Sequence, residues 1–125
     1  KVEQSGTASA VVDMVRANKM GLVVIDASTA MQGQGPSVHQ GGQLVKMDLI
    51  IAGRNPLATD MTAAAIMGFK PAEVSTFTWA WKAGMTPTGL DEIEVRGEKL
   101  ADVGQNFIRP TIYPWDAIRQ YGPPC

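Results

Sequence analysis

Apolar residues along the chain follow two different spacings, and these spacings predict alternating helices and strands. Over residues 7–19 they recur every three or four positions, which is typical of an amphipathic helix. Residues 22–25 and 47–52 are instead nearly continuous apolar runs, rich in β-branched side chains. The first run predicts a strand that is buried on both faces of a sheet, whereas Asp48 interrupts the second run and should leave one face near that end less buried. The first of these strands is expected to end at Asp26.

Residues that favour turns and helix ends mark the other elements. Asn55 and Pro56 suit the N-cap and the first position of a helix, which is expected to run to Met67 and end at Gly68. Residues 70–82 are expected to form a further helix. Later in the chain we expect strands at 93–96 and 106–110 and one or two helical turns at 115–121.

Helices that alternate with apolar strands predict an α/β fold. We expect a single small layered domain over residues 1–125, with a parallel or mixed sheet flanked by helices and an irregular tail from residue 98. The strands at 22–25, 47–52 and 93–96, with at most a short edge strand at 106–110, make a small sheet, and the chain begins with Lys1 rather than Met. Both observations favour the interpretation that this chain is part of a larger domain.

Composition narrows the classes of function. The 125 residues carry a formal net charge of −1 without a basic run, which argues against nucleic-acid binding. No apolar stretch approaches the roughly 20 residues of a membrane span, and the N-terminus lacks a signal-peptide pattern. Cys125 is the only cysteine, so this chain alone can form neither an internal disulfide nor a cysteine-ligated metal site. A cytoplasmic location fits these features.

The segment "MQGQGPSVHQGGQ", residues 31–43, contains four glycines and the only histidine, His39. A connection this long is either functional or mobile. It matches neither phosphate-binding glycine pattern, GxxxxGK[ST] or GxGxxG. Gly33 and Gly35 permit a positive φ, and the pair at 41–42 suits the tip of a hairpin. His39 has no second ligand at a metal-site spacing, and we expect it to be solvated.

Ligands of open α/β sheets bind beyond the carboxyl ends of the strands. If the two strands are parallel, the first delivers Asp26 and the glycine-rich loop to that edge. The second delivers Arg54 and Asn55 at a helix N-terminus, whose free N–H groups favour an anion. The alternative is that Asn55 only caps the helix and Arg54 is a solvated surface charge.

Asp60 is expected on the side of its helix that carries Met61, opposite Thr59 and Thr62. Removing a carboxylate from water is costly, so Asp60 needs a partner such as a backbone amide, Arg54, a metal ion or a ligand. The alternative is a structural acid bonded to loop amides.

Other side chains give weaker indications. Trp79 and Trp81 are two positions apart and cannot share one helix face, so one is expected in the core and the other at an interface. No nucleophile and base can be paired, which leaves open whether the protein is an enzyme.

Three segments in this order, "VVIDASTAMQGQGP", "MDLIIAGRNPLATDMTAAAIMGF" and "KPAEV", resemble the C-terminal half of domain of unknown function family 362 over about residues 7–97. The resemblance implies an association with ferredoxin-type modules that hold [4Fe–4S] clusters, and hence redox work. The cluster cysteines would lie in a segment outside this chain.

The resemblance also carries over to individual positions. The chain departs from the family at Gln32 and Asn55, where the family usually has acids, and this weakens any inherited metal site. The family's other polar, glycine and proline positions match Asp26, Gly33, Gly35, Pro36 and Asp60.

Two hypotheses follow. The first is a ligand- or metal-binding module of a redox-associated protein, in which Asp26 and Asp60 hold a divalent cation or a polar ligand under the loop. The second is a non-catalytic interaction or scaffold domain that contacts a partner chain. The partner would be a ferredoxin-type domain or a segment that precedes this chain. In the first hypothesis the other ligand-binding residues are Gly33, Gly35, Pro36, Arg54 and Asn55.

Overall fold

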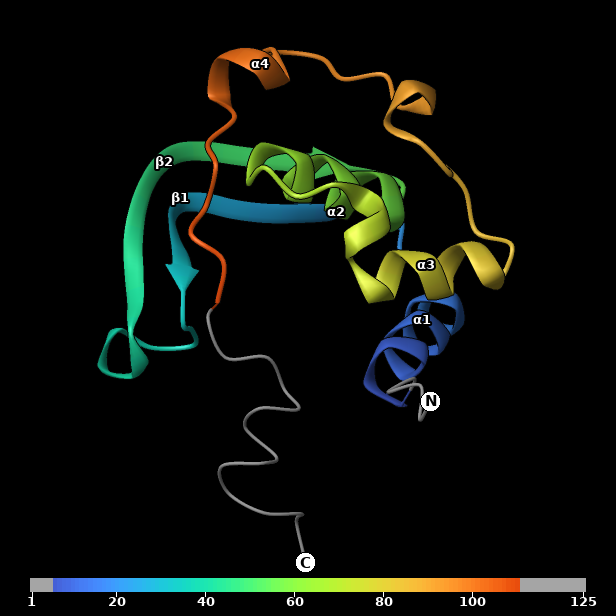
Figure 1. Cartoon of the computed structure of the whole chain (residues 1–125). Helices are drawn as coiled ribbons and strands as arrows, with labels where there is room; N and C mark the ends of the chain where they lie inside the picture. Colours follow the sequence, from blue (N-terminus) through green and yellow to red (C-terminus); the bar gives the residue numbers. More distant parts are fainter. Residues whose placement is uncertain (1–5, 111–125) are drawn as a thin grey trace, which may run out of the picture. The chain divides into compact units, whose positions relative to one another are not determined.

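The computed structural model describes residues 6–110, which form helices and one β-hairpin (Figure 1). Helix α1 (Gly6–Asn18) comes first and leads into strands β1 (Val23–Gly33) and β2 (Gly42–Gly53). The remaining elements are α2 (Pro56–Ile66), α3 (Ser75–Lys82) and α4 (Leu100–Val103), with 3-10 turns η1 (Val38–Gln40), η2 (Pro71–Glu73) and η3 (Leu90–Glu92).

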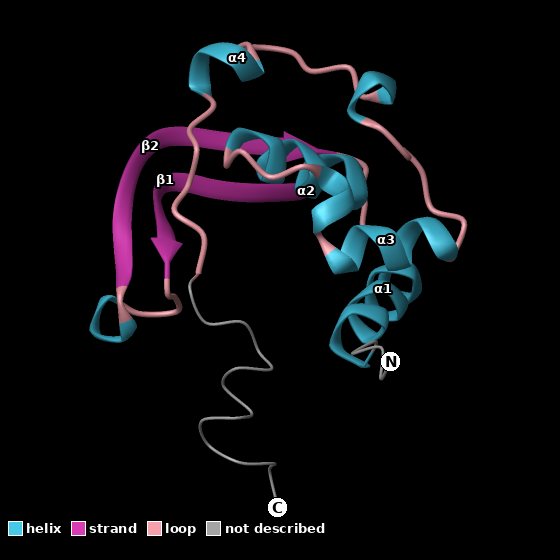
Figure 2. Cartoon of the chain, viewed as in Figure 1, coloured by secondary structure: helices cyan, strands magenta, loops and turns pink. Residues whose placement is uncertain are grey.

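The sheet consists of β1 and β2 alone, paired antiparallel (Figure 2). The expectation of a parallel or mixed sheet was therefore wrong, although the α/β character is confirmed. The expected end of the first strand at Asp26 was also wrong, because β1 continues to Gly33. Only residues 34–41 then connect the strands. A parallel pair needs a crossover of a dozen or more residues, so a connection this short yields a hairpin.

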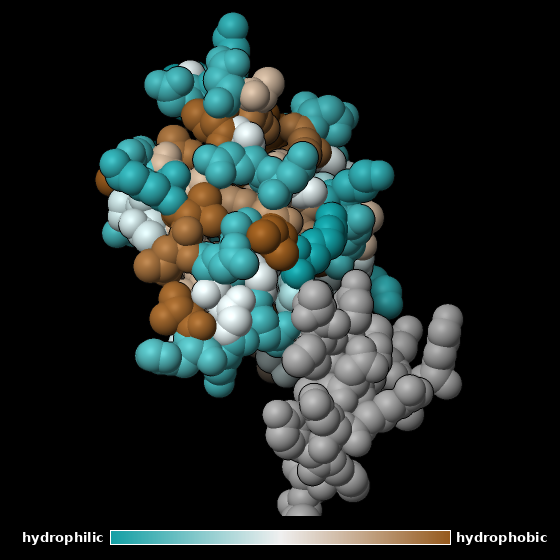
Figure 3. All heavy atoms as spheres, turned by 60° about the vertical axis from the view of Figure 1, so that its left-hand side comes forward, coloured by the Kyte–Doolittle hydropathy of each residue, from teal (hydrophilic) through white to brown (hydrophobic). Residues whose placement is uncertain are grey.

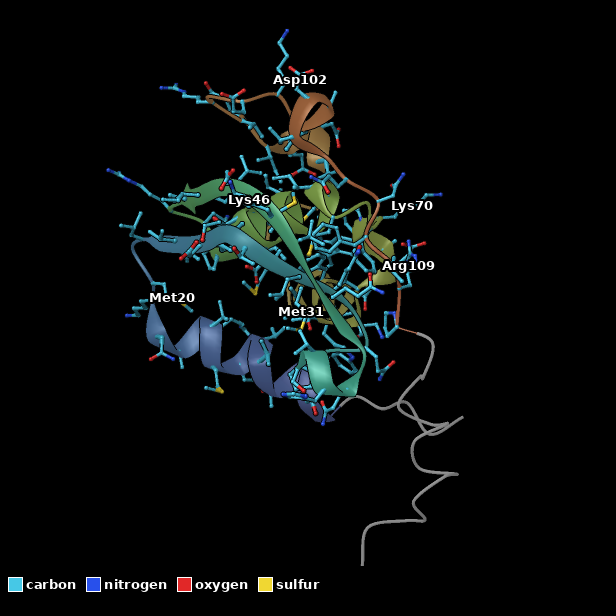
Figure 4. All side chains as sticks on the ribbon, turned by 90° about the vertical axis from the view of Figure 1, so that its left-hand side faces the viewer. Met20, Met31, Lys46, Lys70, Asp102 and Arg109 are labelled. Atoms are coloured by element: carbon cyan, nitrogen blue, oxygen red, sulfur yellow. The ribbon has the colours of Figure 1, made fainter. Side chains whose placement is uncertain are left out.

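Near the turn, two glutamine side chains interact across the hairpin. Nε2 of Gln32 donates to Oε1 of Gln43 at 3.3 Å. Farther along β2, Asp48 has a φ of 51°, in the left-handed region. Its exposed carboxylate lies 3.1 Å from the ammonium group of Lys46, which Figure 4 labels. The expectation that Asp48 makes one face of this strand less buried is confirmed.

The chain divides into two compact units, which are described separately below. Among the described residues, unit 1 comprises residues 6–26 and 50–106, and unit 2 comprises residues 27–49 and 107–110. The helices and the open ends of both strands belong to unit 1. The hairpin connection belongs to unit 2.

The hydrophobic core of unit 1 lies among helices α1, α2 and α3. Met61 of α2 is completely buried, with 0% of its surface exposed. The strands contribute little: Leu22, Val24 and Ile50 are 65%, 57% and 74% exposed. The expectation that the first strand is buried on both faces was thus wrong, because the apolar runs form a two-stranded hairpin with one outward face. The buried core cluster is Val12, Leu57, Met61, Ala64, Phe77 and Ala80.

Helix α2 is buried on more sides than its pattern predicted. Thr59 and Thr62, expected on the polar side, are 4% and 7% exposed. Their hydroxyl groups donate to the carbonyls of Asn55 and Ala58, at 2.9 and 2.8 Å. Because each hydroxyl finds its acceptor four residues back along the chain, threonine can be buried here without an unsatisfied polar group.

The turn signals around the helices were largely confirmed. Helix α2 begins at Pro56, and Gly68 follows its end with a φ of 78°, as expected. The expected helix over residues 70–82 is divided into η2 and α3. The strands expected at 93–96 and 106–110 were wrong, since neither segment joins the sheet. The turns expected at 115–121 lie outside the described residues.

Both tryptophans of α3 pack against the core cluster. The indole N–H of Trp81 donates to the carbonyl of Pro87 at 3.0 Å. The ammonium nitrogen of Lys82 lies 4.6 Å from the centre of the Trp79 ring. Within residues 6–110, no helix has the length and apolar character needed to cross a membrane.

Truncation of Met61 tests where the core lies. We expect Met61→Ala to lower the free energy of unfolding by about 2–5 kcal/mol in urea titrations, because a cavity remains in a tightly packed site. The matched control is Met14→Ala on α1, where the side chain is 64% exposed and the expected change is below about 0.5 kcal/mol. Equal effects of the two substitutions would contradict a core centred on α2.

Candidate functional site

The residues proposed for a ligand site fall into two groups. Asp26, Arg54, Asn55 and Asp60 belong to unit 1. The second group lies in unit 2: Gly33 ends β1, and Gly35 and Pro36 lie in the hairpin connection.

The antiparallel pairing removes the geometric reason for a shared site at the strand ends. The carboxyl end of β1, at Gly33, pairs near the start of β2, whereas β2 ends at Gly53 near the start of β1. Asp26 is the fourth residue of β1 and is exposed there, rather than standing at its end. The glycine-rich connection therefore leads from one strand to the next and does not open α2.

The glycines at the two strand ends beside the connection are favoured by backbone conformation and by close packing within unit 2. Gly33 has a φ of 75°, which glycine adopts without steric cost. A Cβ atom on Gly42 would lie 2.6 Å from Sδ of Met31 and 2.8 Å from the carbonyl oxygen of Ser37. Met31 is labelled in Figure 4. His39 lies in η1 and is exposed, as expected.

Gln32 has a structural role that the sequence did not reveal. Its side-chain Oε1 accepts from the backbone N–H of Ile108 at 2.9 Å, while its Nε2 donates to Gln43. The N–H of Gly33 also donates to the carbonyl of Ile108, at 2.8 Å. An amide can donate and accept at once, whereas a carboxylate only accepts, so this position uses the property that an acid lacks. The only sign of this role in the sequence was that Gln32 stands where the family usually has an acid.

Asn55 is occupied by the fold. Its Oδ1 accepts from the backbone N–H of Ala58 at 3.1 Å, which caps α2, and its Nδ2 donates to the carbonyl of Thr86 at 2.8 Å. The carbonyl of Asn55 also accepts from Thr59, as described above. The structural alternative for Asn55, a helix cap, is therefore observed. Arg54 beside it is exposed and forms no ion pair within residues 6–110.

Asp60 borders an apolar pocket between α1, α2 and α3. The pocket has a volume of about 30 Å³, and its walls include Val15, Leu57 and Phe77. Although the residue as a whole is exposed, the wall beside it partly removes its carboxyl group from water. This desolvation raises the pKa of Asp60 above its ordinary value of 3.8.

The expected partner of Asp60 is not among the described residues. Its carboxylate forms no hydrogen bond or ion pair with any side chain or loop amide in residues 6–110. Asp60 is also the only charged residue of α2. The bonds to loop amides that the structural alternative required are thus missing from this part of the chain.

The donor groups fit metal and cluster binding poorly. No group of three or more histidine, cysteine or acidic side chains that could hold a metal ion occurs within residues 6–110. A [4Fe–4S] cluster is held by cysteine thiolates, and the chain has one cysteine. The chain by itself therefore lacks the ligands for such a cluster. Asp26 and Asp60 as a metal pair stay a prediction.

Two substitutions of Asn55 separate the cap from the bond to Thr86. We expect Asn55→Ala to lower the free energy of unfolding by about 0.5–2 kcal/mol, because α2 loses its cap. Asn55→Asp keeps the acceptor for Ala58 and loses only the donor to Thr86, so it should destabilise less. The measurement is thermal and urea unfolding, and an Asp variant as unstable as the Ala variant would contradict the capping role.

Asp60 should make the stability depend on pH in an identifiable direction. A carboxyl group whose pKa is higher in the folded than in the unfolded protein costs stability as pH rises from the unfolded value through the folded one. We therefore expect Asp60→Asn to be as stable as the parent near pH 3, and more stable above the raised pKa. Urea titrations from pH 3 to pH 7 measure this. A variant less stable than the parent at pH 7 would indicate a favourable partner for the carboxylate.

Comparisons with known proteins give one match. The family model "Domain of unknown function (DUF362)" matches residues 2–65, which include α1, the hairpin and nearly all of α2. The resemblance was expected to extend further, to about residue 97. Neither the curated proteins nor the solved structures that were compared contain a match to the chain. Because the family model covers half of the sequence, the chain belongs to the DUF362 family.

Proposed function

We propose that this chain is an interaction module that binds an extended, apolar segment of a partner protein along the open end of its hairpin. The observation that carries the proposal is a patch of exposed apolar side chains in unit 1. This strand patch consists of Leu22, Val24 and Ile50, which are all more than half exposed.

The strand patch is built into the hairpin rather than scattered over the surface. Val24 alternates with the half-buried Val23 and Ile25, so it points outward from β1. Ile50 alternates in the same way in β2, and Leu22 immediately precedes β1. Figure 3 shows apolar residues in brown among hydrophilic ones on the surface that it presents. Contiguous exposed apolar side chains are typical of surfaces that bind other proteins.

An extended segment is the occupant that the backbone favours. In a two-stranded sheet each strand has an outer edge, and among residues 6–110 no third strand pairs with either one. An edge strand presents unpaired N–H and C=O groups that a further strand can satisfy. A segment that alternates apolar and polar residues would pair with an edge and place its apolar side chains beside the strand patch, on the same face of the sheet.

The first hypothesis, a ligand or metal under the glycine-rich loop, receives less support. It relied on parallel strands that bring Asp26, Arg54 and the loop to one edge. Because the hairpin is antiparallel, the first hypothesis loses the strand geometry on which it relied.

The iron–sulfur association that the resemblance implied would then concern the partner. Since the chain has a single cysteine, cluster chemistry requires another protein or another segment. A ferredoxin-type domain is accordingly one partner to test, beside partners without a cofactor.

A designed peptide tests the proposal without knowledge of the natural partner. The probe alternates valine and threonine and has a glutamate at each end, and its control carries proline at two central positions, which prevents ladder hydrogen bonds. We expect the probe alone to bind and to protect amides of β1 or β2 in hydrogen exchange. Ile50→Lys should weaken binding at least tenfold, since burial of such a side chain contributes about 1.5–3 kcal/mol.

The matched control variant is Val38→Lys, in η1 of unit 2, where the valine is 51% exposed. It should bind the probe like the parent. Equal binding of the probe and the proline peptide, or equal effects of the two variants, would contradict the proposal. If the parent dimerises and Ile50→Lys abolishes dimerisation without peptide binding, the occupant is a second copy and the proposed partner is wrong.

A further inference from the structure

The apolar pocket beside Asp60 is distinct from the strand patch. It lies among the three core helices of unit 1 and is lined by Val11 and Val15 of α1, Leu57 of α2 and Phe77 of α3. These walls are aliphatic or aromatic. A volume of about 30 Å³ admits only a few atoms, so an occupant would insert a slender apolar group and leave the rest at the surface.

Two polar side chains border the pocket, Asp60 of α2 and Thr76 of α3. Neither one forms a side-chain hydrogen bond with another of the residues from 6 to 110. Asp60 is exposed, so water can solvate its carboxylate, but beside the apolar walls an ion pair with a cationic ligand would be stronger than in open solvent. The same walls partly desolvate the carboxyl group and raise the pKa of Asp60.

We propose that this pocket binds a short primary alkylammonium group, with the ammonium on Asp60 and Thr76 and the carbon chain against the apolar walls. The three N–H bonds of an ammonium group suit a carboxylate and a hydroxyl oxygen together. A short, unbranched carbon chain matches a narrow apolar pocket. Anionic ligands are disfavoured by Asp60, and a lone carboxylate is a poor site for a metal ion.

This chemistry has two sources, a free small amine and the lysine side chain of a peptide. Both present an ammonium group on a short carbon chain. The experiment therefore compares n-butylammonium, which represents the shared group alone, with an acetylated and amidated lysine, which represents a lysine within a polypeptide.

Titrations followed by backbone amide NMR shifts test the proposal. We expect n-butylammonium to shift amides of α1, α2 and α3 in a saturable way, and n-butanol, of similar shape but uncharged, to bind at least tenfold more weakly. Asp60→Asn removes the charge and nearly preserves the shape, so it should weaken n-butylammonium binding at least tenfold. Asp102→Asn on α4, an exposed acid away from the pocket residues, is the matched control and should leave binding unchanged.

The outcomes separate the alternatives. Equal binding of n-butylammonium and n-butanol, or equal effects of the two Asn variants, would overturn the proposal, as would a lack of saturable shifts at the pocket. Tighter binding of the capped lysine would assign the site to a peptide side chain, and tighter binding of n-butylammonium would assign it to a free amine. The peptide probe of the strand patch contains no lysine, so either proposal can fail without the other.

Discussion

Burial of α2 on nearly all of its sides is the constraint on which unit 1 depends. Met61 fills the centre of the core, and α1 and α3 supply the other buried apolar side chains of the cluster. A helix surrounded in this way cannot carry unsatisfied polar groups, and Thr59 and Thr62 meet that condition through carbonyls one turn back along the chain. Asn55 meets it at the first turn. The start, the packing and the end of α2 are thus mutually consistent.

The same constraint explains why Asp60 is chemically distinctive. It is the only charged residue of α2, and it lies where the helix meets the apolar walls of the pocket. The threonines are bonded to carbonyls of their own segment, so they leave no donor for the carboxylate. Among residues 6–110 the carboxylate of Asp60 therefore has no protein partner, which leaves it open to water or to a ligand. This reasoning does not depend on the sheet, since the pocket lies entirely among helical and loop residues of unit 1.

Local signals allowed several parts of the structure to be predicted from the sequence. Asn55 and Pro56 marked the start of α2, and Gly68 its end, because these residue types act through their own backbone and side-chain geometry. The helical wheel also placed Asp60 near apolar neighbours. Strand direction was different: an apolar run contains no information on direction, and an assumed end at Asp26 left a gap long enough for a crossover. Once β1 extends to Gly33, the short connection permits only a hairpin.

The burial of the strands could not be derived either, for a related reason. A run such as residues 22–25 predicts apolar surroundings on both sides, but the chain between residues 6 and 110 covers only one face of the hairpin. Val24 and Ile50 are thus apolar side chains that the residues between 6 and 110 leave mostly exposed. The half-buried residues that alternate with them show that the opposite face of the hairpin is partly covered. The mismatch between sequence pattern and exposure is itself informative. The carboxylate of Asp60 favours a cationic ligand, whereas the strand patch favours apolar contact and backbone pairing, so the two surfaces suit partners of different chemistry.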